Sequence, residues 1–144
     1  MWFSKKEMPV KPAGQPASQI TTKSRGDSAE ALALAHLQSA GLRWLASNYR
    51  TPGRGGGEID LIMSDADGTL VFVEVRQRAS ASHCGAGASI SAVNQRRIVF
   101  AARHYLIRYK TLPPCRFDVV LLQGAGLAGE HPTIEWLRSA FDAF

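Results

Sequence analysis

Two apolar segments of strand length, Glu58–Ser64 and Leu70–Arg76, lie on either side of the sequence Asp-Ala-Asp-Gly at 65–68. The four residues between them are a strong turn signal, because aspartate and glycine accommodate the tight backbone of a hairpin. Valine, isoleucine and phenylalanine in the flanking segments favour strands. The sequence therefore predicts an antiparallel hairpin whose register is set by its turn.

The register of this hairpin brings acidic side chains together. With the turn centred on Asp67, Asp60 lies opposite Glu74 and Glu58 lies opposite Arg76. All four share one face because side chains alternate along a strand, unless a bulge in either strand shifts the register. Directly opposed residues have Cβ atoms about 4.5–5.5 Å apart, and like charges at that spacing destabilise the pair. A divalent cation removes the repulsion and takes both carboxylates as hard oxygen ligands.

Apolar side chains on both faces of the hairpin predict burial on both. Ile62 and Phe72 share the face of the acidic pair, and the other face carries Ile59, Leu61, Val71, Val73 and Val75. Carboxylates in such surroundings need partners, since burial of an uncompensated charge is costly. A metal ion is one such partner. The alternative is a salt-bridged cluster in which Glu58, Asp60 and Glu74 share Arg76, Arg78 and Arg54.

The rest of the chain predicts further helices and strands around the hairpin. Residues 1–22 are rich in Lys, Pro, Ser and Gln and predict a disordered tail, which leaves 23–144 as one domain. The other expected elements are a helix from Asp27 to a cap at Gly41, a strand at Arg43–Tyr49, a helix from about Ser91 to Tyr109, a buried central strand at Phe117–Leu122, an edge strand at Thr133–Leu137 and a short helical end at Ala140–Phe144. The order αβββαβ predicts an α/β fold, with a mixed sheet flanked by helices.

Composition narrows the class of protein. The 144 residues give room for one domain and little more, and the chain shows neither an apolar run long enough to span a bilayer nor a signal peptide. Cys84 and Cys115 lack the spacing of a zinc site or a disulfide framework. We therefore expect a cytoplasmic protein with no membrane partner. The net charge of +5 and the pI of about 9.6 favour nucleic acid as a partner, because basic proteins gain affinity for polyphosphates by releasing counterions.

Four motifs, in order, resemble the YraN family of small bacterial proteins. They are Gly-Asp-Ser-Ala-Glu at 26–30, Gly-Gly-Glu-Ile-Asp-Leu-Ile at 56–62, Val-Phe-Val-Glu-Val-Arg-Gln-Arg at 71–78 and Arg-Phe-Asp-Val-Val at 116–120. The resemblance covers about Thr22 to Phe144. The core of that family is similar to the PD-(D/E)xK nuclease superfamily, as in restriction endonucleases and Holliday-junction resolvases. It implies a restriction endonuclease-like fold and a nuclease site that uses Mg²⁺ or Mn²⁺.

The superfamily pattern assigns roles to the hairpin residues. Asp60 matches the aspartate that begins the metal site, and Glu74 matches the acidic residue of the (D/E)xK triplet. Arg76 occupies the position of the triplet's lysine, which is a departure from the pattern. Arginine stays protonated and cannot be a general base, but it can hold a phosphate or stabilise charge on phosphorus. The resemblance thus implies a catalytic set of Asp60, Glu74 and Arg76.

The two predicted helices carry most of the remaining candidates. Glu30 resembles an acidic residue that many relatives supply as a further metal ligand, and its alternative role is in a capping box with Asp27. The second helix has a cationic face that suits phosphates, although a solvated helix surface is the commoner role of such residues. Asp118 is expected to anchor Arg116 or a helix end, without a catalytic role. The candidate nucleic-acid-binding residues are Arg78, Gln95, Arg96, Arg97 and Arg103.

Three functions are consistent with these features. The first is a metal-dependent phosphodiesterase that acts in DNA processing or repair, with DNA favoured over RNA. The second is an inactive module of the same fold that only binds nucleic acid, which the arginine at position 76 favours. The third is a protein-interaction or assembly factor. A homodimer is also an open expectation, since compact nuclease domains often dimerise to cut two strands.

Overall fold

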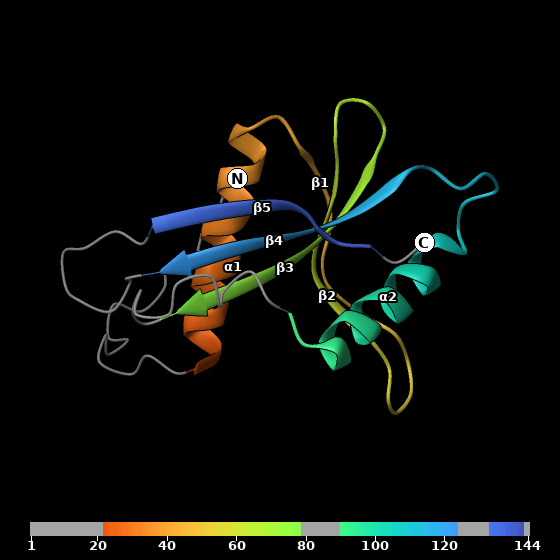
Figure 1. Cartoon of the computed structure of the whole chain (residues 1–144), viewed down its shortest axis with the longest axis horizontal. Coiled ribbons are helices and arrows are strands. Elements are labelled where there is room, and N and C mark those ends of the chain that lie inside the picture. Colours follow the sequence, from red (N-terminus) through yellow and green to blue (C-terminus); the bar gives the residue numbers. More distant parts are fainter. Residues whose placement is uncertain (1–21, 79–89, 124–132, 143–144) are drawn as a thin grey trace, which may run out of the picture.

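The computed structural model describes residues 22–78, 90–123 and 133–142. Over these residues the chain is an α/β domain with one five-stranded mixed sheet and two helices (Figure 1). The elements in chain order are α1 (Thr22–Ser39), β1 (Arg43–Arg50), β2 (Glu58–Ser64), β3 (Leu70–Arg78), α2 (Ala92–Leu106), β4 (Cys115–Gln123) and β5 (Thr133–Phe141). This order confirms the predicted αβββαβ core with its added edge strand, and the arrangement is compatible with a restriction endonuclease-like fold.

The sheet has the strand order β1-β2-β3-β4-β5, in which only β3 and β4 are parallel. The hairpin register is the predicted one, with Leu61 opposite Val73 and Ser64 opposite Leu70. The turn closes where the Asp65 N–H donates to the Thr69 carbonyl at 2.9 Å. Strand β4, predicted to be buried, lies between β3 and β5. The local turn signal was therefore sufficient to fix how β2 and β3 pair.

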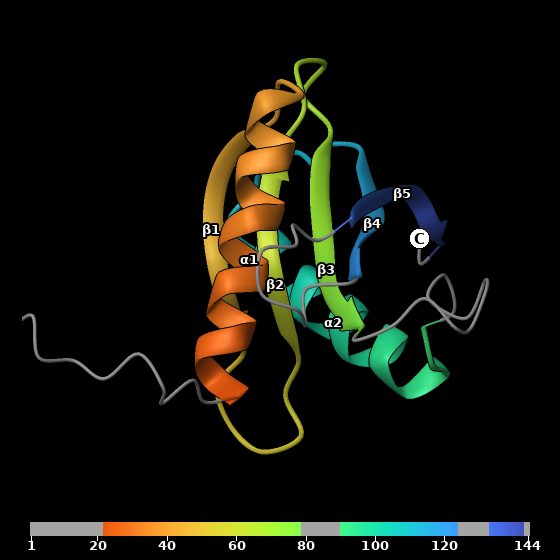
Figure 2. The ribbon, with the colours of Figure 1, turned by 90° about the vertical axis from the view of Figure 1, so that its left-hand side faces the viewer.

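The two helices cover opposite faces of the sheet, as Figure 2 shows. Helix α1 packs through Ala33 and Leu37 on a core that includes Leu61 and Val73. Helix α2 covers the other face, where its core includes Ile62, Phe72 and Phe117. Ile59 belongs to this second core, so its predicted side was wrong. The ladder between β2 and β3 reaches only Leu61, and beyond it β2 no longer keeps strict alternation against β3.

Two predicted helix boundaries need correction. Helix α1 begins at Thr22, so the backbone of Asp27 is already helical and the capping-box alternative for Glu30 is wrong. Residues 1–21 of the predicted tail lie outside the described residues. Helix α2 ends at Leu106 rather than Tyr109, and Ser91 is its N-cap, accepting a hydrogen bond from the Asn94 N–H at 3.1 Å.

The predicted helical end of the chain is also wrong. Residues 140 and 141 continue strand β5 through Phe141, and Phe117 stacks on Phe141 with ring centroids 4.9 Å apart. The β4–β5 register shifts between Phe117 and Val119, and Ser139 has a φ of 51°. The irregularity lets β5 extend past a bulge that sequence periodicity does not reveal.

None of the helices in the described ranges has the length and apolar character needed to cross a membrane.

Candidate functional site

The hairpin opens at the position that the sequence assigned to Asp60 and Glu74. The backbone ladder between β2 and β3 ends at the Leu61–Val73 pair, and in the next position Asp60 Oδ2 accepts a hydrogen bond from the Val75 N–H at 2.8 Å. A side chain has thus replaced the backbone acceptor, and the strands part. The carboxyl groups of Asp60 and Glu74 lie close enough to shift each other's pKa and line one cavity, so the structure brings the predicted pair together.

A small cavity of about 140 Å³ lies at this opening. Its walls are Glu58, Asp60 and Glu74 from the sheet and Asn94, Arg97 and Ile98 from the first turns of α2. Three of the six lining side chains are acidic and only Ile98 is apolar, so the cavity suits a small polar or cationic ligand. It lies on the α2 face of the sheet, where Ile62 and Phe72 continue the same face toward the core.

The two carboxyl groups hold more negative charge than their surroundings offset. Burial raises the pKa of Asp60, a shift that the Val75 N–H opposes and the charge of Glu58 increases. Burial and then the charge of Asp60 raise the pKa of Glu74 to about 8, although Arg76 acts in the opposite direction. Two adjacent carboxylates without a full counter-charge share a proton, and a divalent cation is the other way to stabilise them.

The predicted alternative, an arginine cluster that neutralises the acids, is only partly present. Arg76 Nη1 lies 4.0 Å from Glu74 Oε2, at the outer limit of an ion pair. Glu58 pairs across to β1, with Arg50 at 3.5 Å, rather than with Arg76. Among the described residues Asp60 has no ion pair. The shortfall of positive charge is therefore concentrated at Asp60.

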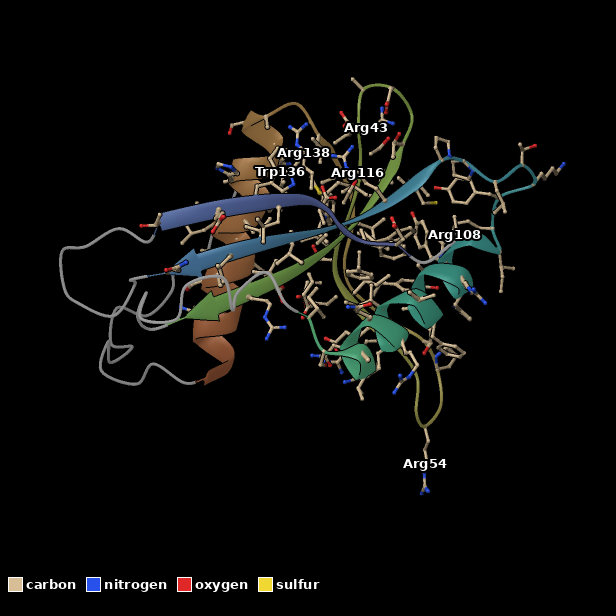
Figure 3. The ribbon with its side chains drawn as sticks, viewed as in Figure 1. Arg43, Arg54, Arg108, Arg116, Trp136 and Arg138 are labelled. Carbon is tan, nitrogen blue, oxygen red and sulfur yellow. The ribbon has the colours of Figure 1, made fainter. Side chains whose placement is uncertain are left out.

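Two predicted participants in that cluster do not contribute a described contact to the acids. Arg54 extends away from the body of the protein at the tip of the loop between β1 and β2 (Figure 3). Arg78 ends strand β3, and its side chain lies outside what the structure describes.

Asp60 and Glu74 adjoin at this site, and Glu30 does not join them. Glu30 is half-buried on α1, whose buried side packs on the opposite face of the sheet. Across the described ranges, no three His, Cys, Asp or Glu side chains are grouped so as to hold a metal ion. The ligand role of Glu30 stays a prediction, and a cation at the pair would complete its coordination with water or phosphate oxygens.

The cationic face predicted for the second helix divides into different roles. All three arginines of this face are exposed on α2, but only Arg97 lines the cavity, together with Asn94, and Arg96 and Arg103 do not. Gln95 donates from Nε2 to the Ile90 carbonyl at 2.9 Å, which places it in the helix start rather than in the cavity. Sequence reasoning did not select Asn94. The spacing of Asn94, Arg97 and Ile98, three and four residues apart on one helix face, is the signal that could have found it.

Fold and site together define a class: an α/β domain, compatible with a restriction endonuclease-like core, that carries a carboxylate pair where two strands part. Residues 29–122 match the profile described as "Uncharacterised protein family UPF0102". The chain belongs to the UPF0102 family, which is the YraN family that its motifs resemble.

Curated relatives that carry the same family name align with most of this chain. A UPF0102 protein of Polaromonas naphthalenivorans (strain CJ2) is 68% identical, with 99% of each chain covered. One of Paracidovorax citrulli (strain AAC00-1) is 63% identical over 90% of this chain and 91% of the relative. One of Cupriavidus taiwanensis is 54% identical over 84% of this chain and 85% of the relative.

Proposed function

We propose that this protein is a metal-dependent phosphodiesterase that acts on nucleic acid, with DNA favoured over RNA, in DNA processing or repair in the cytoplasm. The observation that carries the proposal is the contact between Asp60 and Glu74 in a polar cavity without full counter-charge. Paired hard oxygen donors of this kind suit Mg²⁺ or Mn²⁺. The net charge of +5 supports a polyanionic substrate.

Each residue has a distinct part in the proposed reaction. Asp60 and Glu74 would hold the cation, which when bound lowers the pKa of water and neutralises charge on the phosphate. The Val75 N–H fixes one oxygen of Asp60, so the carboxylate is already oriented. Arg76, on the same strand as Glu74, would hold the scissile phosphate as a permanent cation. Arg96, Arg97 and Arg103 would contact the nucleic-acid backbone from α2.

A calorimetric titration of Mg²⁺ and of Mn²⁺ tests the site before any substrate is chosen. Wild type is expected to bind one of the two ions with a heat signal that Asp60→Asn and Glu74→Gln abolish. Glu135→Gln is a matched control because Glu135 is exposed on β5 and does not line the acidic cavity. Wild type that binds neither ion would contradict the metal site.

Cleavage assays then test the activity itself. With Mg²⁺ or Mn²⁺, plasmid, linear and branched DNA are incubated with wild type and the same variants. Loss of one metal ligand is expected to lower the cleavage rate by about 100-fold or more, since the metal carries both water activation and charge stabilisation. A preparation that binds the ion and cuts none of these substrates would contradict the proposed activity on DNA.

A second candidate function is a module that binds nucleic acid without cutting it. Arg76 favours it, because an arginine in place of lysine cannot exchange a proton with water. This candidate predicts DNA binding that weakens as salt rises and that survives both Asp60→Asn and Glu74→Gln. The measurements are fluorescence anisotropy of a labelled DNA at several salt concentrations and the cleavage assay above.

A further inference from the structure

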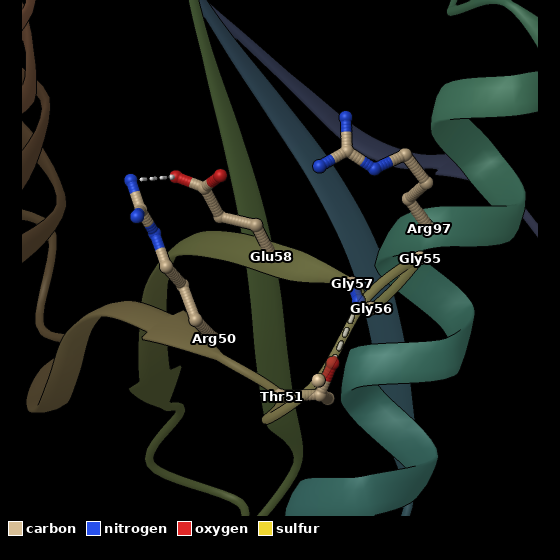
Figure 4. Close-up of a pocket in the computed structure, with 8 residues that line it drawn as sticks. Arg50, Thr51, Gly55, Gly56, Gly57, Glu58 and Arg97 are labelled. Carbon is tan, nitrogen blue, oxygen red and sulfur yellow. Dashed lines mark hydrogen bonds and ion pairs between the residues drawn. The ribbon is translucent and has the colours of Figure 1, made fainter.

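A second cavity, of about 370 Å³, adjoins the acidic one and has a different chemical character. It lies between the loop that joins β1 to β2 and the start of α2 (Figure 4). Arg50, Thr51, Glu58 and Arg97 line it together with four glycines of the loop. No apolar side chain is among these lining residues. A ligand that fills this cavity must therefore be polar, because an apolar ligand would find no apolar side chain to pack against.

The loop is held at its neck and against the helix. The Thr51 N–H donates to the Gly57 carbonyl at 3.1 Å, and the Gly57 N–H donates to Thr51 Oγ1 at 2.8 Å. A Cβ on Gly57 would clash with the Arg97 carbonyl oxygen, so only glycine allows β2 to pass this close to α2. The cavity wall is thus fixed to the element that carries Arg97.

The tip of the loop between β1 and β2, which includes Gly53 and Gly55, presents backbone rather than side chains to the cavity. Gly53 and Gly55 have φ angles of 88° and 68°, which favour glycine, and no atom lies within 4 Å of where their Cβ atoms would be. A ligand in the cavity can therefore approach the main chain directly. Arg54, between them, is exposed and does not line the cavity. Close backbone approach of this kind is a common way to hold phosphate oxygens.

Two guanidinium groups face this cavity from different elements. In Figure 4 the Glu58 carboxylate lies between Arg50 of β1 and Arg97 of α2. Arg50 is bound to Glu58 at 3.5 Å and its side chain is 72% exposed, so it stays beside the cavity and remains accessible. Two cations against one carboxylate leave the cavity positive. Guanidinium is the side-chain group whose geometry best matches phosphate.

We propose that this cavity binds a phosphodiester group of the nucleic-acid strand, next to the phosphate that lies at Asp60 and Glu74. Glu58 and Arg97 line both cavities, so the two sites adjoin and one strand can occupy both. Arg50, Arg97 and the glycine backbone hold the neighbouring phosphate and set the register of the strand over the carboxylates. Glu58 opposes this binding and occupies Arg50 until a phosphate replaces it. The inference rests on the proposed function, since it names a subsite for the same substrate.

The test is fluorescence anisotropy with labelled single-stranded and duplex DNA in EDTA, where no cleavage competes with binding. Arg50→Ala and Arg97→Ala are each expected to weaken binding about 5- to 10-fold and to reduce the slope of log affinity against log salt by about one contact, roughly 0.7 to 0.9. Arg54→Ala is the matched control: it removes the same charge from the loop that forms the cavity wall, but Arg54 itself lies outside the cavity. Glu58→Gln is expected to tighten binding about 3-fold, because it removes repulsion and releases Arg50.

The outcomes separate this inference from the proposed function. Tighter binding by Glu58→Gln together with weaker binding by both cavity arginine variants supports the subsite, and a change in structural stability alone would not tighten binding. If wild type binds DNA and the cavity variants match Arg54→Ala, the subsite is wrong while the proposed function stands. If wild type binds neither single-stranded nor duplex DNA at low salt, both the subsite and the proposed function are wrong. Thermal unfolding of each variant within a few degrees of wild type shows that the fold is retained.

Discussion

Two carboxylate sites in this molecule solve the problem of a buried acid in opposite ways. Asp118 is fully buried, and both of its oxygens are occupied by donors. Arg116 Nε lies 3.1 and 3.2 Å from them, Trp136 Nε1 donates at 2.9 Å and the Ser139 N–H at 3.0 Å. Asp60 and Glu74 have one backbone donor, one distant arginine and each other.

The difference separates structural from chemical use of an acid. The Asp118 network joins β4 to the bulge of β5 and, through Arg116 and Asp65 at 2.9 Å, to the hairpin turn. Each oxygen of Asp118 already accepts two hydrogen bonds. The prediction that Asp118 anchors Arg116 is confirmed. The pair at Asp60 and Glu74 keeps oxygen atoms facing a cavity, at a cost in stability that a bound cation would offset. In the proposed function, these incompletely satisfied oxygen atoms are the ones that would bind the cation.

Removal of the Asp118 carboxylate should produce the largest change in stability. Asp118→Ala leaves the guanidinium of Arg116 with one ionic partner and deprives Trp136 and Ser139 of theirs, so we expect a loss of about 3–5 kcal/mol in the free energy of unfolding. Urea unfolding followed by circular dichroism measures it. Asp118→Asn, which keeps an acceptor, should lose less and provides a folded comparison if the alanine variant fails to fold. A loss below about 1 kcal/mol in both would remove the contrast between the two sites.

The pH dependence of stability should have opposite sign at the two sites. The pKa of Glu74 is raised to about 8, so between its ordinary value and that pH the folded state keeps a proton that the unfolded chain has released. Stability from this group therefore falls as pH rises through that window. The Arg116 guanidinium lowers the pKa of Asp65, and the stability from Asp65 is lost only as pH falls through its lowered pKa.

The variant Glu74→Gln isolates the first effect. In EDTA, the free energy of unfolding of Glu74→Gln minus that of wild type should increase by on the order of 2 kcal/mol between about pH 5 and pH 9. This allows for screening, since the Glu74 side chain is 20% exposed. Urea unfolding at each pH measures it, and added Mg²⁺ at the high end should reduce the difference. Parallel curves for the two proteins would show that the pair is already compensated.

Features that depend on contacts between residues close in the sequence could be predicted, whereas features that depend on contacts between distant residues could not. The pairing of Asp60 with Glu74 depends on a turn only a few residues away, and Gly68, with a φ of 91°, supplies the backbone geometry that the Asp-Gly signal indicates. The extension of β5 depends on the Asp118 carboxylate holding the Ser139 N–H across 21 residues. No local pattern contains that contact. The expected helical end was therefore wrong although its residues favoured it.

The same reasoning explains which site residues were found. The acidic pair lies on one hairpin and was found from spacing alone. The contribution of Asn94 requires knowledge of which turn of α2 meets the opening between the strands. That placement depends on Gly57, whose missing side chain lets β2 approach the helix backbone. In the sequence Gly57 is one of four glycines in a loop, with nothing to distinguish it from its neighbours.

The smallest expected change in stability, and the sharpest test between the two candidate functions, comes from Arg76→Lys. The ion pair of Arg76 with Glu74 is 4.0 Å long and its side chain is 32% exposed, so the free energy of unfolding should change by less than about 0.5 kcal/mol. If Arg76 holds the scissile phosphate in an active enzyme, lysine keeps the charge but loses the two parallel hydrogen bonds, and cleavage should fall about 10-fold. Cleavage that instead rises, or first appears, in Arg76→Lys would mean that arginine at this position disables the chemistry. The wild-type protein would then be a nucleic-acid-binding module whose acidic pair is retained without catalysis.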